Sequence, residues 1–133
     1  MASLIYLDTH AVVWLYSGMV ERFPAAARNA IETSDLLVSS MALLELQYLS
    51  EIGRFNASVD MVLAALRGDL GLMVCDLPFP QVARCAQDQS WTRDPFDRRI
   101  VSQAALREAP LLTKDESIHE HYPLALWSEP LAV

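Results

Sequence analysis

The chain has 133 residues, which is enough for one domain with a moderate hydrophobic core and no need for disulfides or a structural metal. Hydrophobic residues make up 53% of the sequence and the mean hydropathy is +0.20, so a disordered tail is excluded. No apolar run is long enough to cross a bilayer, and the net charge of −7 argues against non-specific binding of nucleic acid unless the carboxylates gather around a cation.

The N-terminus and the two cysteines indicate the compartment. The first residues carry no basic side chain and reach Asp8 after a short apolar run, so they do not resemble a secretory signal, and we expect a cytoplasmic protein with no membrane partner. Cys75 and Cys85 lack metal-binding spacing and are expected to be reduced core residues. His119 and His121 have no cysteine nearby and are expected on the surface rather than as zinc ligands.

The first predicted element is a buried strand over residues 4–7, followed by a helix over 10–16. Asp8 stands between the two, at the carboxyl end of the strand. That edge is where open α/β sheets bind ligands, whereas an aspartate immediately before a helix can equally well serve as its N-terminal cap.

Helices and short apolar runs alternate along the rest of the chain. Helices are predicted over residues 24–33, 40–53, 59–67, 80–89 and 94–104, and strands over residues 36–38, 71–75, 111–113 and 124–127. This alternation is typical of a parallel sheet covered by helices on both faces. We therefore predict an α/β protein, a three-layer α/β/α sandwich, with one domain spanning residues 1–133.

The helix over residues 40–53 contains one acidic residue within an apolar stripe. Glu45 lies among residues that follow the helical repeat of three and four, namely Met41, Leu44, Tyr48, Leu49 and Ile52. We expect this stripe to face the core, where an unpaired charge is costly. A functional carboxylate is therefore favoured over a buried ion pair.

The segment 93–104 combines charges of both signs with the start of a helix. Asp94 followed by Pro95 is a helix-start signal, and Asp97 shares a face with apolar residues one turn further on, which places its carboxylate at the edge of the core. Arg98 and Arg99 are candidates to bind phosphate groups, with solvated charges on the helix surface as the alternative.

Four acidic residues could meet at one edge of the predicted sheet. Asp8 and Asp115 follow strands, while Glu45 and Asp97 lie on helix faces that turn inward. Carboxylates only a few ångströms apart raise one another's pKa unless cations neutralise them. Oxygen ligands without cysteine or histidine select hard ions, so the expected cofactor is Mg²⁺ or Mn²⁺.

These motifs resemble those of the PIN-domain ribonucleases and, among them, the VapC-type toxins of bacterial toxin–antitoxin systems. The resemblance covers residues 4–127 and includes, in order, Leu7-Asp8-Thr9-His10, Glu45, the segment 94–104, and Leu112-Thr113-Lys114-Asp115. It implies a PIN-like fold and Mg²⁺- or Mn²⁺-dependent hydrolysis of RNA phosphodiester bonds. It also implies a cognate antitoxin as partner, RNA as substrate, and a homodimer.

The resemblance assigns roles to individual residues. Asp8, Glu45 and Asp97 match the three main acidic positions, and Asp115 matches a fourth, where the family accepts aspartate or asparagine. All four are expected to hold the metal and to be catalytic. Thr113 matches a hydroxyl position beside the fourth acid. Asp94 is either a helix cap or a residue that supports the metal ligands from behind.

Two other functional classes remain as alternatives. A receiver-like signalling domain also places acids, a threonine and a lysine around Mg²⁺, and Thr113-Lys114 fits it, but Asp8 lacks the acidic neighbour that such a domain needs. A non-catalytic binding module on the same fold is the other alternative, and the presence of all four acids disfavours it. Part of the apolar surface of residues 12–16 and 41–52 is expected to bind the antitoxin or a second subunit.

Overall fold

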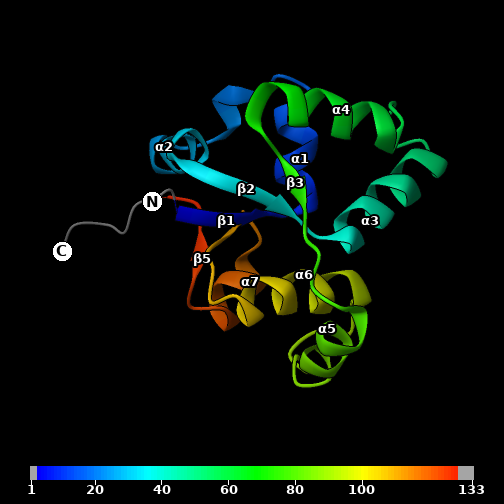
Figure 1. Cartoon of the computed structure of the whole chain (residues 1–133), viewed down its shortest axis with the longest axis vertical. Coiled ribbons are helices and arrows are strands. Elements are labelled where there is room, and N and C mark those ends of the chain that lie inside the picture. Colours follow the sequence, from blue (N-terminus) through cyan, green and yellow to red (C-terminus); the bar gives the residue numbers. More distant parts are fainter. Residues whose placement is uncertain (1–2, 129–133) are drawn as a thin grey trace.

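A single parallel sheet organises the molecule. The computed structural model describes residues 3–128 (Figure 1). Within them, five strands pair in the order β3-β2-β1-β4-β5, and all four pairings are parallel. The strands are β1 (Ser3–Leu7), β2 (Ser34–Val38), β3 (Met73–Val74), β4 (Leu111–Leu112) and β5 (Ala125–Leu126). Each one coincides with a predicted strand, so the predicted parallel sheet is confirmed.

Helices cover both faces of the sheet, with α1 and α4 on one side and α5, α6 and α7 on the other (Figure 1). The helical elements are α1 (Thr9–Tyr16), η1 (Val20–Arg22), α2 (Ala25–Thr33), α3 (Ser40–Glu51), α4 (Val59–Leu70), α5 (Phe79–Ala86), α6 (Pro95–Leu106) and α7 (Glu116–His121). This arrangement confirms the predicted α/β/α architecture. The short elements η1 and α7 were not predicted. No helix within residues 3–128 is both long and apolar enough to span a membrane.

Strand β1 is the centre of the core. Ile5, Tyr6 and Leu7 are buried, because β1 is paired on both sides and covered on both faces. Leu7 is in register with Val38 of β2 and with Leu112 of β4. The backbone N–H of Asp8 extends the ladder by donating to the Leu112 carbonyl at 3.1 Å. The carboxyl ends of three neighbouring strands therefore lie side by side, with Asp8 in the middle.

The apolar face of α6 also packs as predicted, with Ile100, Val101 and Ala104 buried. Cys75 is buried and Cys85 is half-buried, and both are free thiols, so neither forms a disulfide. Cys75 Sγ lies 2.9 Å from the hydroxyl of Tyr6 in the core. The expectation of reduced cysteines in or near the core agrees with this packing.

The predicted inward face of α3 is wrong. Leu44, Tyr48 and Ile52 expose 52%, 50% and 46% of their surface, whereas the residues of α3 that are buried are Ala42 and Leu46. The apolar stripe therefore points largely to solvent, and Glu45 lies at its border rather than in the core. Helical periodicity identifies the residues that share a face correctly, but α3 packs against α6, α1 and α4 through the face next to it.

Candidate active site

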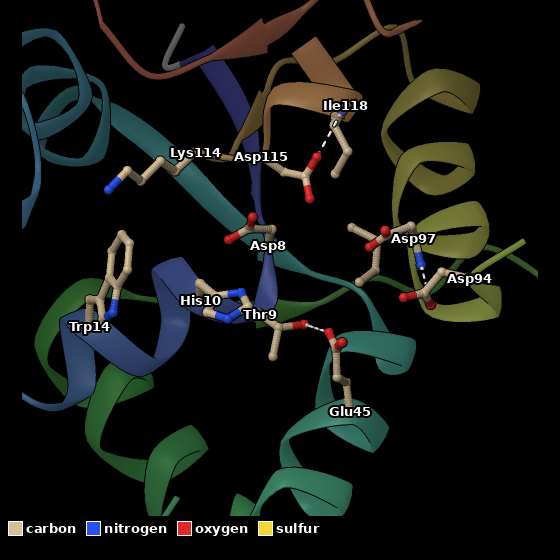
Figure 2. A pocket seen from close by; sticks show the side chains of 11 residues that line it. Asp8, Thr9, His10, Trp14, Glu45, Asp94, Asp97, Lys114, Asp115 and Ile118 are labelled. Atoms are coloured by element: carbon tan, nitrogen blue, oxygen red, sulfur yellow. Dashed lines mark hydrogen bonds between the residues drawn. The ribbon is translucent and has the colours of Figure 1, made fainter. Parts of the chain in front are cut away.

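A pocket of about 410 Å³ opens at the carboxyl ends of the central strands. Figure 2 shows that carboxylates approach it from several elements: Asp8 follows β1, Glu45 comes from α3, Asp97 from α6, and Asp115 follows β4. All four predicted acids line this one pocket, and so does Asp94. Residues separated by more than one hundred positions in the sequence are thus brought together by the parallel topology.

Three of these acids are also helix caps. Asp8 Oδ1 accepts a hydrogen bond from Ala11 N at 2.8 Å, and Asp115 Oδ1 accepts one from Ile118 N at 3.0 Å. Asp94 Oδ1 accepts from Phe96 N at 2.8 Å and so caps α6. Capping and a place in the pocket are therefore not alternatives for these residues. The amino ends of α1, α6 and α7 all point at the pocket, and the partial positive charge there favours carboxylates.

Glu45 is held by a residue of the neighbouring helix. Its Oε1 accepts a hydrogen bond from the hydroxyl of Thr9, which is buried at the start of α1 (Figure 2). This bond holds the Glu45 carboxylate at the pocket. The sequence suggests a functional carboxylate because of its apolar neighbours; the structure instead attributes its place in the pocket to contact between α3 and the amino end of α1.

Thr113 is fully buried beside the pocket and links two of the acids. Its Oγ1 accepts a hydrogen bond from Asp115 N at 3.1 Å, and its hydroxyl donates towards the Asp8 carboxylate, which favours the ionised form of Asp8. On the other side, His119 Nε2 lies 2.7 Å from the Thr113 carbonyl oxygen. Thr113 therefore fixes the relative positions of Asp8 and Asp115. Both His119 and His121 are exposed, as expected.

Burial and mutual repulsion raise the pKa of three carboxyl groups in the pocket. Burial raises the pKa of Asp97 to about 7, and the nearby charges of Asp94, Asp115, Glu45 and Asp8 add to the shift. Burial is also the main reason that the pKa of Asp8 is raised, while the Thr113 hydroxyl and the Ala11 N–H oppose it. The pKa of Glu45 is raised by burial too, and the bond from Thr9 opposes that shift. The pocket therefore holds more negative charge than its surroundings neutralise.

The donor set fits a hard divalent cation, although the carboxylates do not form a closed cage. Within residues 3–128, no three acidic, thiol or imidazole side chains are close enough to ligate one ion together. Mg²⁺ does not require such a cage, because it keeps several waters and typically binds proteins through one or two carboxylates. Asp8, Glu45, Asp97 and Asp115 offer only oxygen ligands, and the raised pKa values of the first three show that a positive charge there would be stabilised.

The structure turns both candidate phosphate-binding arginines away from this pocket. Arg98 Nε donates to the Thr92 carbonyl at 2.7 Å, and the Arg99 guanidinium stacks on Phe79, with its Cζ 4.6 Å from the ring centroid. Neither lines the acidic pocket. Their binding of RNA elsewhere on the surface stays a prediction.

Sequence reasoning missed the wall of the pocket opposite the acids. His10, Trp14 and Lys114 line that side, and the Lys114 Nζ lies 5.8 Å from the centroid of the Trp14 ring (Figure 2). His10 and Lys114 adjoin Thr9 and Thr113, so their nearness in sequence to strand-end residues was the signal available. Trp14 gave no such signal, because its helix is apolar almost all round.

A comparison with protein families matches residues 5–122 to the PIN domain. The chain belongs to the PIN-domain family. This membership decides against the receiver-like alternative. No curated protein sequence matches the chain significantly.

Solved structures with the same fold include members of two bacterial complexes. The chain is similar to one in the crystal structure of VapBC2 from Rickettsia felis bound to a DNA fragment from their promoter, with a TM-score of 0.65 and 18% identity over 94% of this chain and 98% of that one. It is also similar to one in DNA-bound VapBC from Salmonella typhimurium, with a TM-score of 0.60 and 23% identity over 97% and 98% of the two chains. A domain of a functionally unknown protein from Methanocaldococcus jannaschii has a TM-score of 0.58 and 16% identity over 99% and 93%.

Proposed function

We propose that this PIN-domain chain is a metal-dependent endoribonuclease that acts as the toxin of a toxin–antitoxin pair. The observation that carries the proposal is the convergence of Asp8, Glu45, Asp97 and Asp115 on one pocket at the carboxyl edge of the sheet. Family membership supports nuclease chemistry, and the similarity to chains of two VapBC complexes supports a toxin role. RNA is the proposed substrate and Mg²⁺ or Mn²⁺ the proposed cofactor.

The four acids would hold the cation, and the residues around them would keep those acids in place. Asp8 is fixed by the Ala11 N–H and by Thr113, Glu45 by Thr9, and Asp115 by the first turn of α7. A divalent ion in such a site polarises the phosphoryl group and makes water a stronger nucleophile. Asp94 caps the amino end of α6 by accepting hydrogen bonds from Phe96 N and Asp97 N. This cap holds the backbone of Asp97 in place.

The opposite wall supplies positive charge for the substrate. Lys114 and His10 line the pocket across from Asp97 (Figure 2), and an ammonium group there can pair with a phosphate oxygen. We assign to Lys114 the phosphate contact for which Arg98 and Arg99 were candidates. In this arrangement the acids would hold the cation beside the scissile phosphate, while Lys114 would orient the RNA backbone.

The partners that we propose are RNA, a cognate antitoxin and a second copy of the chain, in the cytoplasm. The similar chains belong to VapBC assemblies, which supports an antitoxin partner. The exposed apolar residues of α3 provide surface for a protein contact. An antitoxin bound near the pocket would inhibit the nuclease by excluding RNA.

Asp8→Asn is the sharpest test of the proposed activity. Asparagine caps helices as well as aspartate does, so this variant removes the charge and keeps the bond from Ala11 N. Antitoxin-free protein is incubated with total bacterial RNA in Mg²⁺, in Mn²⁺ and in EDTA, and cut ends are mapped by sequencing. We expect discrete, metal-dependent cuts by the wild-type chain and a loss of at least about a hundredfold in rate for the variant.

The control is Asp35→Asn, because Asp35 is an exposed acid of β2 that does not line the pocket. It should cleave at the wild-type rate. Thermal unfolding with and without Mn²⁺ gives a second readout: Mn²⁺ should raise the melting temperature of the wild type and of the control, but not of Asp8→Asn. A folded protein that neither cleaves RNA nor binds Mn²⁺ would refute the four-acid site.

A further inference from the structure

A second pocket, of about 350 Å³, adjoins the acidic one and shares Trp14 with it. It is formed by the end of α1, by η1 and by the segment that joins α3 to α4. The lining residues are Val13, Trp14, Tyr16, Ser17, Met19, Arg22, Arg54, Phe55, Asn56 and Ala57. A group bound here would lie on the far side of Trp14 from the carboxylates.

The second pocket differs from the acidic one in charge. Arg22 and Arg54 line it and, within residues 3–128, no carboxylate does, in a chain whose net charge is −7. Guanidinium groups bind phosphate through several donors at once. The pocket is thus a cationic recess directly beside a strongly anionic one.

Aromatic rings form much of the remaining wall. Tyr16 and Phe55 lie edge to face, with ring centroids 6.0 Å apart, and Trp14 completes the aromatic lining. Nucleobases stack on such rings with little dependence on sequence. Arginine next to aromatic surface matches the phosphate and the base of one nucleotide.

Trp14, Arg22 and the backbone of Arg54 are held in place. Trp14 packs edge-on against buried Phe23, with centroids 6.0 Å apart, and the Arg22 Cζ lies 5.3 Å from the centroid of the Trp14 ring. Arg54 follows the end of α3, where Gly53 has a φ of +77° and Arg54 N donates to the Leu49 carbonyl at 2.8 Å. A preformed site of this kind loses little entropy when it binds its ligand.

Positive charge continues from this pocket to the carboxylates. The Lys114 Nζ lies 5.8 Å from the Trp14 ring centroid and Lys114 lines the acidic pocket, while Arg22 contacts the same ring and lines the second pocket. Trp14 is therefore flanked by one cation for each pocket. Successive phosphates of a single strand could follow this path past the site of cleavage.

We propose that the second pocket binds a nucleotide of single-stranded RNA next to the phosphodiester that is cleaved. Arg22 and Arg54 contact its phosphate, and its base packs on the aromatic wall of Tyr16 and Phe55. This inference rests on the proposed ribonuclease function and adds to it the place where the substrate is positioned. Any base preference at this pocket is modest and follows the strength of stacking.

The test compares two double variants that remove the same charge. Arg22→Gln with Arg54→Gln removes both guanidinium groups from the pocket, and Arg28→Gln with Arg67→Gln removes two exposed arginines that line neither of the two pockets. Each pair is combined with Asp8→Asn so that the RNA stays intact. Binding of a fluorescent single-stranded RNA is measured by anisotropy in Mg²⁺ at several salt concentrations.

We expect the pocket pair to bind RNA about tenfold more weakly and the control pair to bind within about twofold of its parent. The slope of the logarithm of affinity against the logarithm of salt concentration should fall by about 0.7 for each phosphate that the variant no longer neutralises. Phe55→Leu should weaken binding without changing that slope and should alter the relative affinities for homopolymeric RNAs. The rate of RNA cleavage is measured with the same two double variants in a chain that keeps Asp8.

The outcomes separate the two proposals. If the wild type cuts RNA in a metal-dependent way and the two pairs lose affinity equally or not at all, the pocket assignment is wrong and the nuclease stands. If the pocket pair binds RNA normally but no longer binds the antitoxin, the pocket belongs to the protein partner. If the wild type neither binds nor cuts RNA, both proposals fail.

Discussion

At the scale of single residues, Asp97 carries a clear pH dependence. Its pKa of about 7 in the folded chain lies above the ordinary 3.8, so between these two values the folded state keeps a proton that the unfolded state has released. The free energy of unfolding should therefore fall as the pH rises. We expect a loss of about 1 kcal/mol from Asp97 between about pH 5.5 and about pH 7.5, since solvent screens part of the repulsion at this half-buried side chain.

Urea unfolding of the metal-free chain in EDTA at these two pH values measures this loss. Asp97→Asn cannot ionise, so the variant should show a smaller loss and should be more stable than the wild type at the higher pH. Asp8 and Glu45 contribute losses of the same sign, because burial also raises their pKa values. If the free energy of unfolding of Asp97→Asn changed with pH as much as that of the wild type, Asp97 would ionise with an ordinary pKa.

The residues of the pocket differ in how far the sequence predicted them. Asp8 and Asp115 follow short apolar runs, and the end of a strand is visible in sequence as a change from apolar to polar residues. His10 and Lys114 are exposed polar residues with no distinctive pattern, and only the pairing of β1 with β4 brings them to the same wall. Their place depends on tertiary contacts that periodicity does not encode.

At the scale of elements, Asp94 has two roles at the start of α6: its carboxylate caps the helix, and its charge repels Asp97. Its Oδ1 accepts hydrogen bonds from Phe96 N at 2.8 Å and from Asp97 N at 3.3 Å, and its charge raises the pKa of Asp97. Asp94→Asn keeps an acceptor and removes the charge, whereas Asp94→Ala removes both. We expect Asp94→Ala to lower the free energy of unfolding by about 1 kcal/mol.

Asp94→Asn should be at least as stable as the wild type at neutral pH, because it relieves repulsion among the pocket carboxylates. Chemical denaturation of the three proteins in EDTA checks both expectations. Ser58→Ala, which removes the cap of α4 far from the pocket, calibrates the loss of a cap. Equal losses in both Asp94 variants would show that the charge itself stabilises the start of α6.

The elements themselves were mostly predictable, and the exceptions have physical causes. Helix α7 has six residues, too few to show an apolar repeat, and the polar residues Asp115 and Glu116 at its start are equally typical of a loop after β4. In α3 the repeat identifies the apolar face but not the surface that covers it. A stripe of apolar residues indicates burial against something, and in this case the described residues of the chain do not supply the partner surface.

At the scale of the whole molecule, the acidic net charge is distributed unevenly. Five acidic residues line the active-site pocket, where a divalent ion would offset them, and two arginines line the adjoining recess. The overall field therefore repels RNA, while the local field beside Trp14 attracts it. RNA binding therefore depends on local contacts at this recess rather than on general electrostatic attraction.

The exposed face of α3 predicts that the chain forms a homodimer. Leu44 and Tyr48 are about half exposed, and Phe79 of α5 joins Leu44 in a groove of about 210 Å³. Gln103 lines the same groove, and within residues 3–128 its buried Oε1 accepts no hydrogen bond, so a donor from another chain would satisfy it.

Light scattering should give twice the chain mass of 14.9 kDa. Leu44→Glu should give the monomer, because it places a charge in the interface, while Met61→Glu on exposed α4 should stay dimeric. A wild-type chain that remains monomeric at micromolar concentrations would contradict the dimer prediction. The exposed face of α3 would then be assigned to the antitoxin instead.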